Sequence, residues 1–159
     1  MIFVCLGTKR FAFNRLLTEI DSLIENKKVT DNVLAQIGQS DYTPVNYEYK
    51  EFMTPVEYDN AVHNADLIIT HGGTGAIIKA LKAHKQVISV PRREKYGEHS
   101  DDHQLQIVEF FSNNGYVKRI DEMEELEESI KTLFSNPIEK KFEGKGNIID
   151  IIDDFIKKG

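Results

Sequence analysis

A glycine-rich run is the part of the sequence most typical of a ligand site. Residues 71–75 read His-Gly-Gly-Thr-Gly, directly after the apolar segment 66–70, and a helical pattern begins near Thr74. Glycine lets a phosphate approach the backbone amides, and the amino end of a helix favours negative charge. The run therefore predicts a phosphate site, with a tight strand–helix turn that holds no ligand as the alternative. It lacks the lysine of a P-loop and the spacing of a dinucleotide-binding fingerprint, which disfavours ATP hydrolysis and NAD chemistry.

Other segments that follow predicted strands are also rich in glycine or in positive charge. Gly7 and Thr8 follow the first strand, Gly38 follows the second, and residues 92–95 read Arg-Arg-Glu-Lys after the fifth. Arg92, Arg93 and Lys95 are predicted either to bind phosphate or to face an acidic membrane surface, and a solvated charged loop is equally compatible with them. One edge of the sheet would then combine close backbone approach with positive charge, as an anionic small ligand requires.

A second polar segment, residues 99–104, reads His-Ser-Asp-Asp-His-Gln. Asp101 or Asp102 is a candidate helix cap, which would place Gln104 on the first turn, facing the ligand edge. The spacing of His99 and His103 also allows a metal site, but no third histidine or cysteine ligand is evident. Caps and solvated polar residues are the plainer interpretation.

Two further reactive side chains have simple structural interpretations. His71 is a candidate phosphate donor or general base, although a single histidine is more often a hydrogen-bonded turn residue. Cys5 lies in a predicted core strand and is expected to be inert packing.

The elements that would position these residues alternate between strand and helix. Strands are predicted at residues 2–6, 32–37, 45–49, 66–70, 86–90 and 116–120. Apolar residues at helical spacing predict helices over 13–24, from about 74, over 123–134 and over 148–156, and Thr54, Pro55 and Glu57 predict the start of another. Asp121 is expected to cap the helix over 123–134, and Asn113–Gly115 to end the helix before it. This order predicts an α/β, Rossmann-like fold with a mostly parallel sheet and helices on both faces.

Length and composition bound the class of protein. The chain has 159 residues and a mass of 18.2 kDa, so we expect one domain over 1–159, with 137–146 as a mobile connection to the last helix. A net charge of -6 argues against a nucleic-acid partner. One cysteine excludes an internal disulfide, and no apolar run approaches the roughly 20 residues that span a bilayer. The first residues are not typical of a signal peptide, so a cytoplasmic location is expected.

Several of these segments, taken in order, resemble one family of glycosyltransferases. They are residues 3–8 (Phe-Val-Cys-Leu-Gly-Thr), 36–38 (Gln-Ile-Gly), 66–75, Val90-Pro91 and Asp102-His103-Gln104. The chain resembles the UDP-sugar-binding, carboxyl-terminal half of the transferase that adds N-acetylglucosamine to the lipid-linked peptidoglycan precursor. It also resembles the small subunit of the eukaryotic dolichol-linked N-acetylglucosamine transferase, and it is most similar to short exopolysaccharide and capsule glycosyltransferase subunits of bacteria.

The resemblance implies a fold and a set of site residues. The fold would be the carboxyl-terminal half of a GT-B glycosyltransferase. Gly72, Gly73, Thr74 and Gly75 would hold the UDP diphosphate with His71 beside them, His103 and Gln104 would contact the donor sugar, and Gly7 and Thr8 would line the cleft. Larger relatives place a ribose-binding glutamate where this chain has Lys79, and a lysine accepts no hydrogen bond from a hydroxyl.

The resemblance also implies a partner, because these enzymes place the acceptor site in a second half of similar size. We expect a membrane-associated, acceptor-binding subunit that presents a lipid-linked saccharide and recruits this chain to the inner face of the membrane. The expected activity is transfer of a hexose from a UDP-sugar in capsule or exopolysaccharide synthesis. Arg92 or a neighbouring cation would replace a metal ion at the leaving diphosphate, so no metal or other cofactor is expected.

Two other functions fit the sequence. One is a non-catalytic docking or enhancer subunit of a membrane-associated glycosyltransferase, which the lysine at position 79 mildly favours. The other is a generic α/β module that binds a phosphorylated ligand without preference for uridine.

Overall fold

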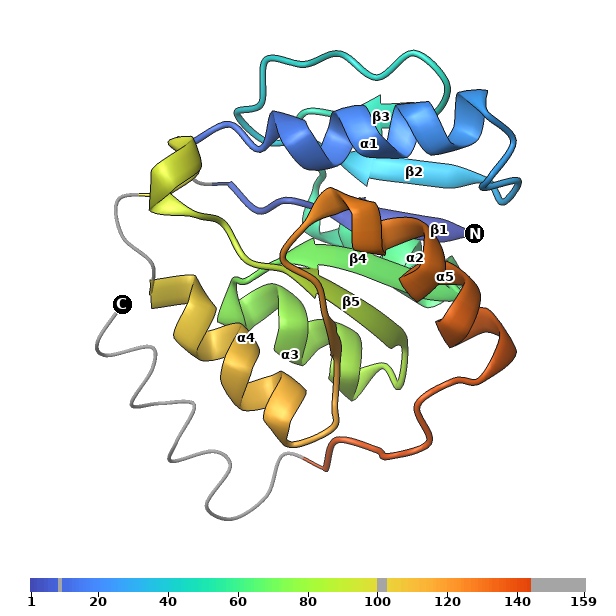
Figure 1. Cartoon of the computed structure of the whole chain (residues 1–159), viewed down its shortest axis with the longest axis vertical. Helices are drawn as coiled ribbons and strands as arrows, with labels where there is room; N and C mark the ends of the chain where they lie inside the picture. Colours follow the sequence, from blue (N-terminus) through green and yellow to red (C-terminus); the bar gives the residue numbers. More distant parts are fainter. Residues whose placement is uncertain (9, 100–102, 144–159) are drawn as a thin grey trace.

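The computed structural model describes residues 1–8, 10–99 and 103–143, with only the backbone of His103 (Figure 1). Within these residues the chain forms one parallel sheet of six strands in the order β3-β2-β1-β4-β5-β6. The strands are β1 (Ile2–Cys5), β2 (Val33–Gln36), β3 (Glu48–Lys50), β4 (Leu67–His71), β5 (Gln86–Val90) and β6 (Lys118–Arg119). The predicted α/β class and parallel sheet are confirmed.

Helices cover both faces of the sheet (Figure 1). On one face, α1 (Asn14–Glu25) and α5 (Leu126–Ser135) share a buried cluster with β1, β2 and β4. On the other face, α2 (Pro55–Asn64), α3 (Thr74–Lys82) and α4 (His103–Asn113) form the second cluster. Two 3₁₀ turns, η1 (Glu94–Tyr96) and η2 (Met123–Glu125), precede α4 and α5. Strands buried on both faces explain the nearly continuous apolar runs in the sequence.

Helix ends follow the sequence signals in two cases and depart from them in a third. Thr54 and Glu57 form the expected capping box of α2, which is worth about 1 kcal/mol. α4 ends at Asn113 as expected, with Gly115 in the left-handed region. The expectation that Asp121 caps the helix predicted over 123–134 is wrong, because Glu122 and Glu125 form the capping box there while Asp121 pairs with Arg119.

The third strand starts later than its alternating pattern predicts. Asp21, buried on α1, accepts hydrogen bonds from the backbone N–H groups of Val45 and Asn46, both at 2.8 Å. Because those amides bond a carboxylate, they are not available to a strand ladder, and pairing begins only at Glu48. Residues 45 and 46 are therefore loop, although their side chains alternate.

The segment after α5 is described as far as residue 143. Gln86 exchanges two hydrogen bonds with the backbone of Ile138, at 2.8 and 3.0 Å, and Phe142 is buried in the second cluster. The predicted helix over 148–156 lies outside the described residues, and a mobile connection over 137–146 stays a prediction. Among the described residues, none of the helices is long and apolar enough to cross a membrane.

Candidate ligand site at the carboxyl edge of the sheet

The site lies where the strand order of the sheet reverses. β1 and β4 are neighbours, and the helices that follow them, α1 and α3, pack on opposite faces. The two connecting segments therefore diverge beyond the carboxyl ends of these strands, and we call the region between them the crevice. Ligands of open α/β sheets bind at this position. Gly7 and Thr8 lie on one side of it, and residues 72–75 lie on the other.

His71 occupies the centre of this crevice. The sequence placed it in a loop, but it is the last residue of β4, paired with Val90, and only 6% of it is exposed. The Thr70 hydroxyl donates to the Cys5 carbonyl at 2.9 Å, and His71 Nδ1 lies 3.2 Å from that hydroxyl oxygen and 3.3 Å from that carbonyl. Since the hydroxyl proton is already used, this pattern places a proton on Nδ1. Nε2 then faces the loops, as an acceptor when the imidazole is neutral and as a donor when it is protonated.

Most of the predicted phosphate-binding glycines have a packing reason to be glycine. A Cβ on Gly7 would lie 2.7 Å from His71 Nε2, and a Cβ on Gly73 would lie 2.3 Å from it. A Cβ on Gly38 would lie 2.5 Å from the Gly7 carbonyl oxygen, and one on Gly72 would lie 2.7 Å from Cβ of Gln104. These four glycines give the imidazole and the neighbouring loops room to pack together.

Gly75 is different because a Cβ there would meet nothing within 4 Å. It lies on the first turn of α3, whose N-cap is Gly73 and therefore provides no side-chain oxygen to the first amides. That turn carries no acidic residue, and Thr74 and Gly75 are at least partly exposed. Amides without a capping side chain, the helix dipole and open space in front of them make this turn suitable for an anion.

Arg92 is completely buried, contrary to the expectation that it contacts the phosphate. Its Nη2 donates to the Leu6 carbonyl at 2.6 Å, and its Nη1 donates to the carbonyls of Phe11 at 2.7 Å and Glu98 at 3.2 Å. The guanidinium also lies 5.2 Å from the ring centre of Phe13. Burial lowers the pKa of Arg92 to about 10, so the group is still charged at neutral pH. Nη1 and Nη2 therefore donate to backbone carbonyls of the chain itself rather than to a ligand.

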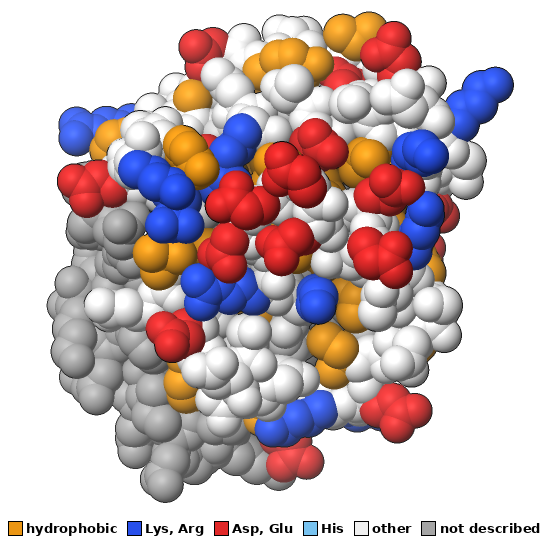
Figure 2. Space-filling view, viewed as in Figure 1, with side chains coloured by type: hydrophobic (Ala, Val, Ile, Leu, Met, Phe, Trp, Pro, Cys, Tyr) orange, Lys and Arg blue, Asp and Glu red, His pale blue; other side chains and the backbone are white. Residues whose placement is uncertain are grey.

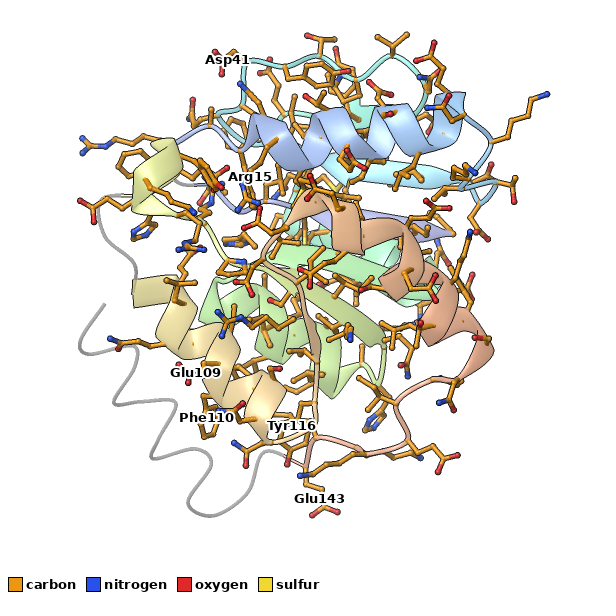
Figure 3. All side chains as sticks on the ribbon, viewed as in Figure 1. Arg15, Asp41, Glu109, Phe110, Tyr116 and Glu143 are labelled. Carbon is orange, nitrogen blue, oxygen red and sulfur yellow. The ribbon has the colours of Figure 1, made fainter. Side chains whose placement is uncertain are left out.

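Arg15 and Glu98 form a second buried contact beside Arg92. Arg15 projects from α1 toward the loop after β5 (Figure 3), and its Nε and Nη2 donate to the two Glu98 carboxylate oxygens at 2.8 and 3.2 Å. Its remaining bonds reach the carbonyls of Pro91 and Asp121, both at 3.1 Å. We call Arg15, Arg92 and Glu98 the arginine clasp. The clasp joins the loops that follow β1, β5 and β6.

Neither Arg15 nor Glu98 was predicted from the sequence as a functional residue. Arg15 lies in the first turn of an amphipathic helix pattern, and Glu98 lies in a charged loop. The contact between them spans 83 residues of sequence, so no local spacing reveals it.

The remaining predicted residues lie on the rim of the site or outside the described part of the chain. Gln104 is buried, packs under Gly72 and accepts a hydrogen bond from the Arg92 backbone N–H at 3.2 Å. Lys95 is exposed and lies 4.8 Å from the ring centre of Tyr96. Residues 100–102 and the His103 side chain are not described, which leaves the sugar contact of His103 a prediction. No group of three metal-ligating side chains occurs in the parts of the chain that the structure describes.

Lys79 lies on α3 and pairs with α2. Its Nζ is 2.5 Å from a carboxylate oxygen of Asp59 and 5.0 Å from the ring centre of Tyr58. The side chains of this ion pair are 46% and 59% exposed. The carboxylate of Asp59 therefore lies beside Lys79, and it comes from the neighbouring helix.

A hollow of about 380 Å³ opens next to the clasp, lined among others by Asn14, Arg15, Tyr96 and Glu122. A larger hollow, of about 660 Å³, lies at the opposite end of the sheet beside Met1, Asp31 and Glu48. We place the candidate site by the backbone amides of α3 and by His71, because these groups lie at the carboxyl edge of the sheet, where ligands of open α/β sheets bind.

Solved structures with the same fold include glycosyltransferases of which this chain covers half or less, and one chain of similar length. The chain superimposes on the glycotransferase of kitacinnamycin with a TM-score of 0.60 and 15% identity, over 98% of this chain and 38% of that one. It superimposes on MurG of Acinetobacter baumannii with a TM-score of 0.59 and 18% identity, over 95% of this chain and 49% of that one. The solution structure of ALG13 gives a TM-score of 0.59 and 19% identity, over 93% of this chain and 91% of that one. The fold is that of the carboxyl-terminal half of a GT-B glycosyltransferase.

The sequence itself defines the family. Residues 1–157 match the model of the glycosyltransferase family 28 C-terminal domain, and the chain belongs to this family. It is 26% identical over 162 aligned positions to the UDP-N-acetylglucosamine--N-acetylmuramyl-(pentapeptide) pyrophosphoryl-undecaprenol N-acetylglucosamine transferase of Streptococcus thermophilus. That alignment covers 98% of this chain and 43% of the relative, so the chain spans less than half the length of that enzyme.

Proposed function

We propose that this chain is the UDP-sugar-binding subunit of a two-chain glycosyltransferase. The observation that carries the proposal is the first turn of α3, where uncapped amides and open space at Gly75 lie beside His71. Membership of the glycosyltransferase family 28 C-terminal domain family supports a nucleotide-sugar as the anion. The proposed reaction is transfer of a hexose to a lipid-linked acceptor in capsule or exopolysaccharide synthesis.

In the proposed mechanism this chain stabilises the leaving group. An acceptor hydroxyl attacks the anomeric carbon of the donor sugar, the bond from that carbon to the diphosphate breaks, and UDP leaves with the bonding electrons. Negative charge grows on the diphosphate, where the amides at the amino end of α3 would face it. The hydroxyl proton passes to a base, for which His71 is the candidate on this chain and the partner is the alternative source. We expect no requirement for a divalent metal ion.

Exposed apolar side chains near the same edge support the need for a second chain. Phe52 is 46% exposed, Val56 is 69% exposed and Tyr96 is 46% exposed. Phe52 and Val56 lie in and after the connection from β3 to α2, and Tyr96 lies in the loop after β5. These side chains therefore stand on both sides of the crevice. An acceptor-binding partner that closes the crevice would bury them.

The first experiment is a calorimetric titration with UDP, using ADP and GDP as controls. The test variant is Gly75→Asp, because the position is open and a carboxylate suits the first turn of a helix. We expect the variant to fold normally and to lose UDP binding by repulsion. The matched control is Thr30→Asp, which adds the same charge at an exposed position before β2, at the other end of the sheet.

Three results would separate the candidate functions. Uridine-selective binding that Gly75→Asp abolishes and Thr30→Asp retains would support the donor subunit. Binding without base preference would support a generic phosphate module. If neither the isolated chain nor its complex with the partner binds UDP, the chain is a docking subunit, a function favoured by the ion pair that occupies Lys79.

A further inference from the structure

One side chain holds both ends of the loop between β1 and α1. Leu6 and Phe11 are five positions apart, and their carbonyls accept from the two terminal nitrogens of Arg92, at 2.6 and 2.7 Å. Gly7 and Thr8, which lie between them, form the wall of the crevice opposite α3. A single guanidinium therefore bonds the backbone at both ends of this wall.

The same loop lies against His71. Gly7 has a φ of +75°, and a Cβ on it would approach His71 Nε2 to 2.7 Å, so the loop backbone is in close contact with the imidazole. On its other side, the Gly7 carbonyl oxygen packs against Gly38, leaving no room for a side chain there. Any outward movement of the loop would open the space in front of His71.

We propose that Arg92 is a positioning residue that fixes the loop between β1 and α1, and through Gly7 fixes the imidazole of His71. Its backbone takes part as well, because the Arg92 N–H donates to Gln104, which packs under Gly72. Arg92 thus reaches both walls of the crevice. The proposed role in UDP binding rests on the proposed function, but the coupling of Arg92 to His71 stands on these contacts alone.

The chemistry of the side chain favours this role over simple packing. A buried guanidinium is costly unless its donors are satisfied, and Nε of Arg92 has no hydrogen-bond partner in the described structure. An apolar side chain would fill the same space without that cost. What arginine adds is a rigid fork of donors, with which Nη1 and Nη2 hold carbonyls from two loops at fixed positions. Lysine carries the charge but not the fork.

The test compares Arg92→Met with Arg119→Met. Both changes replace arginine by methionine. Arg119, however, lies on β6 and bonds Asp121, in the loop that follows this strand. Amide hydrogen exchange over residues 6–13 and the ring resonances of His71 are measured by NMR. In Arg92→Met we expect exchange in the loop to accelerate about tenfold or more, with β4 and β5 amides unchanged, and the His71 resonances to shift. Arg119→Met should leave both signals as in the wild type.

A second measurement, of the guanidinium resonances of Arg92, uses the wild-type chain and does not depend on the folding of a variant. In the wild-type chain, the Nη1 and Nη2 groups of Arg92 should give separate resonances, because bonds to fixed carbonyls stop rotation of the guanidinium. Averaged resonances would overturn the proposal, as would unchanged loop exchange and unchanged His71 signals in folded Arg92→Met. Rescue distinguishes hydrogen bonding from packing: methylguanidinium added to Arg92→Ala should restore the wild-type His71 signals, and failure to do so would contradict the role of the fork.

Titration with UDP links this inference to the proposed function. Arg92→Met should weaken UDP binding about tenfold or more, while Arg119→Met should leave it unchanged. If the wild type binds no UDP, the proposed function fails and the exchange and resonance measurements still decide the role of Arg92. If UDP binds equally well to Arg92→Met while the loop is loosened, the loop position does not contribute to binding, and that part of the inference is wrong.

Discussion

Arg15–Glu98 and Lys131–Glu127 are ion pairs of the same length, 2.8 Å, in opposite surroundings. The side chains of Arg15 and Glu98 are 19% and 4% exposed, and their bond joins α1 to the loop after β5. The side chains of Lys131 and Glu127 are 56% and 33% exposed, and both lie on α5. Equal geometry therefore does not imply equal contribution to the free energy of unfolding.

Burial decides how much each charge depends on its partner. Water replaces the lost partner of an exposed charge, so such pairs contribute little. A buried charge that loses its partner keeps its desolvation cost, so breaking the pair is expensive. In this chain, the buried charges of the clasp gather at the candidate site. Figure 2 shows many acidic side chains on the surface between α1 and α5, where η2 and α5 carry Glu124, Glu125, Glu127 and Glu128.

The largest effect on stability is expected from Glu98→Ala. The substitution removes the two carboxylate oxygens that accept from Arg15, one of which also accepts from the Arg93 backbone N–H, and it leaves the partly buried Arg15 without its counter-charge. We expect a loss of about 3–5 kcal/mol in the free energy of unfolding, measured by urea denaturation. Glu98→Gln keeps one acceptor oxygen and the shape, so it should lose less. A loss below about 1 kcal/mol in Glu98→Ala would show that the clasp behaves like a surface pair.

A smaller effect on stability is expected from Gly73→Ala, at a closely packed position of the glycine run. Gly73→Ala places a Cβ 2.3 Å from His71 Nε2, although its φ of -79° suits any residue. We expect overpacking to cost about 1–3 kcal/mol and to shift the His71 ring resonances.

Gly75→Ala is the matched control, because its Cβ meets nothing and alanine favours the helix. The free energy of unfolding should stay the same or rise by up to about 1 kcal/mol. Equal destabilisation by the two substitutions would contradict the assignment of Gly73 to packing and Gly75 to open space.

The glycine run also shows how far the sequence could predict the site. Its place after a buried strand and before α3 was predicted correctly, because strand and helix patterns are local. The reason for most of its glycines was not predictable. Gly73 faces a neighbour two residues away, while Gly7 and Gly38 face residues brought close only by the parallel pairing of β1, β2 and β4.

Arg92 marks the limit of prediction from residue type. An arginine in a basic loop of an acidic chain suggests an exposed phosphate ligand, yet the Leu6 and Phe11 carbonyls that bind it lie 86 and 81 residues earlier. Backbone carbonyls leave no signature in a sequence. The parallel sheet, by contrast, could be predicted, since alternation of strands and helices indicates this arrangement.

The smallest effect is expected from Glu127→Gln, the exposed counterpart of the clasp variants. Lys131 donates to the Glu127 carboxylate and lowers the pKa of that carboxyl. A carboxyl with a lowered folded pKa contributes stability above its unfolded pKa, about 4.3, and that contribution is lost as the pH falls through the folded value. The difference in free energy of unfolding between wild type and Glu127→Gln should therefore be slight at pH 7 and should vanish in acid. It should also vanish in about 1 M salt, where the screening length is roughly 3 Å. A difference in the free energy of unfolding that persists in acid and in high salt would contradict this prediction. Glu127 would then contribute to stability by packing or hydrogen bonding rather than through a solvent-exposed charge.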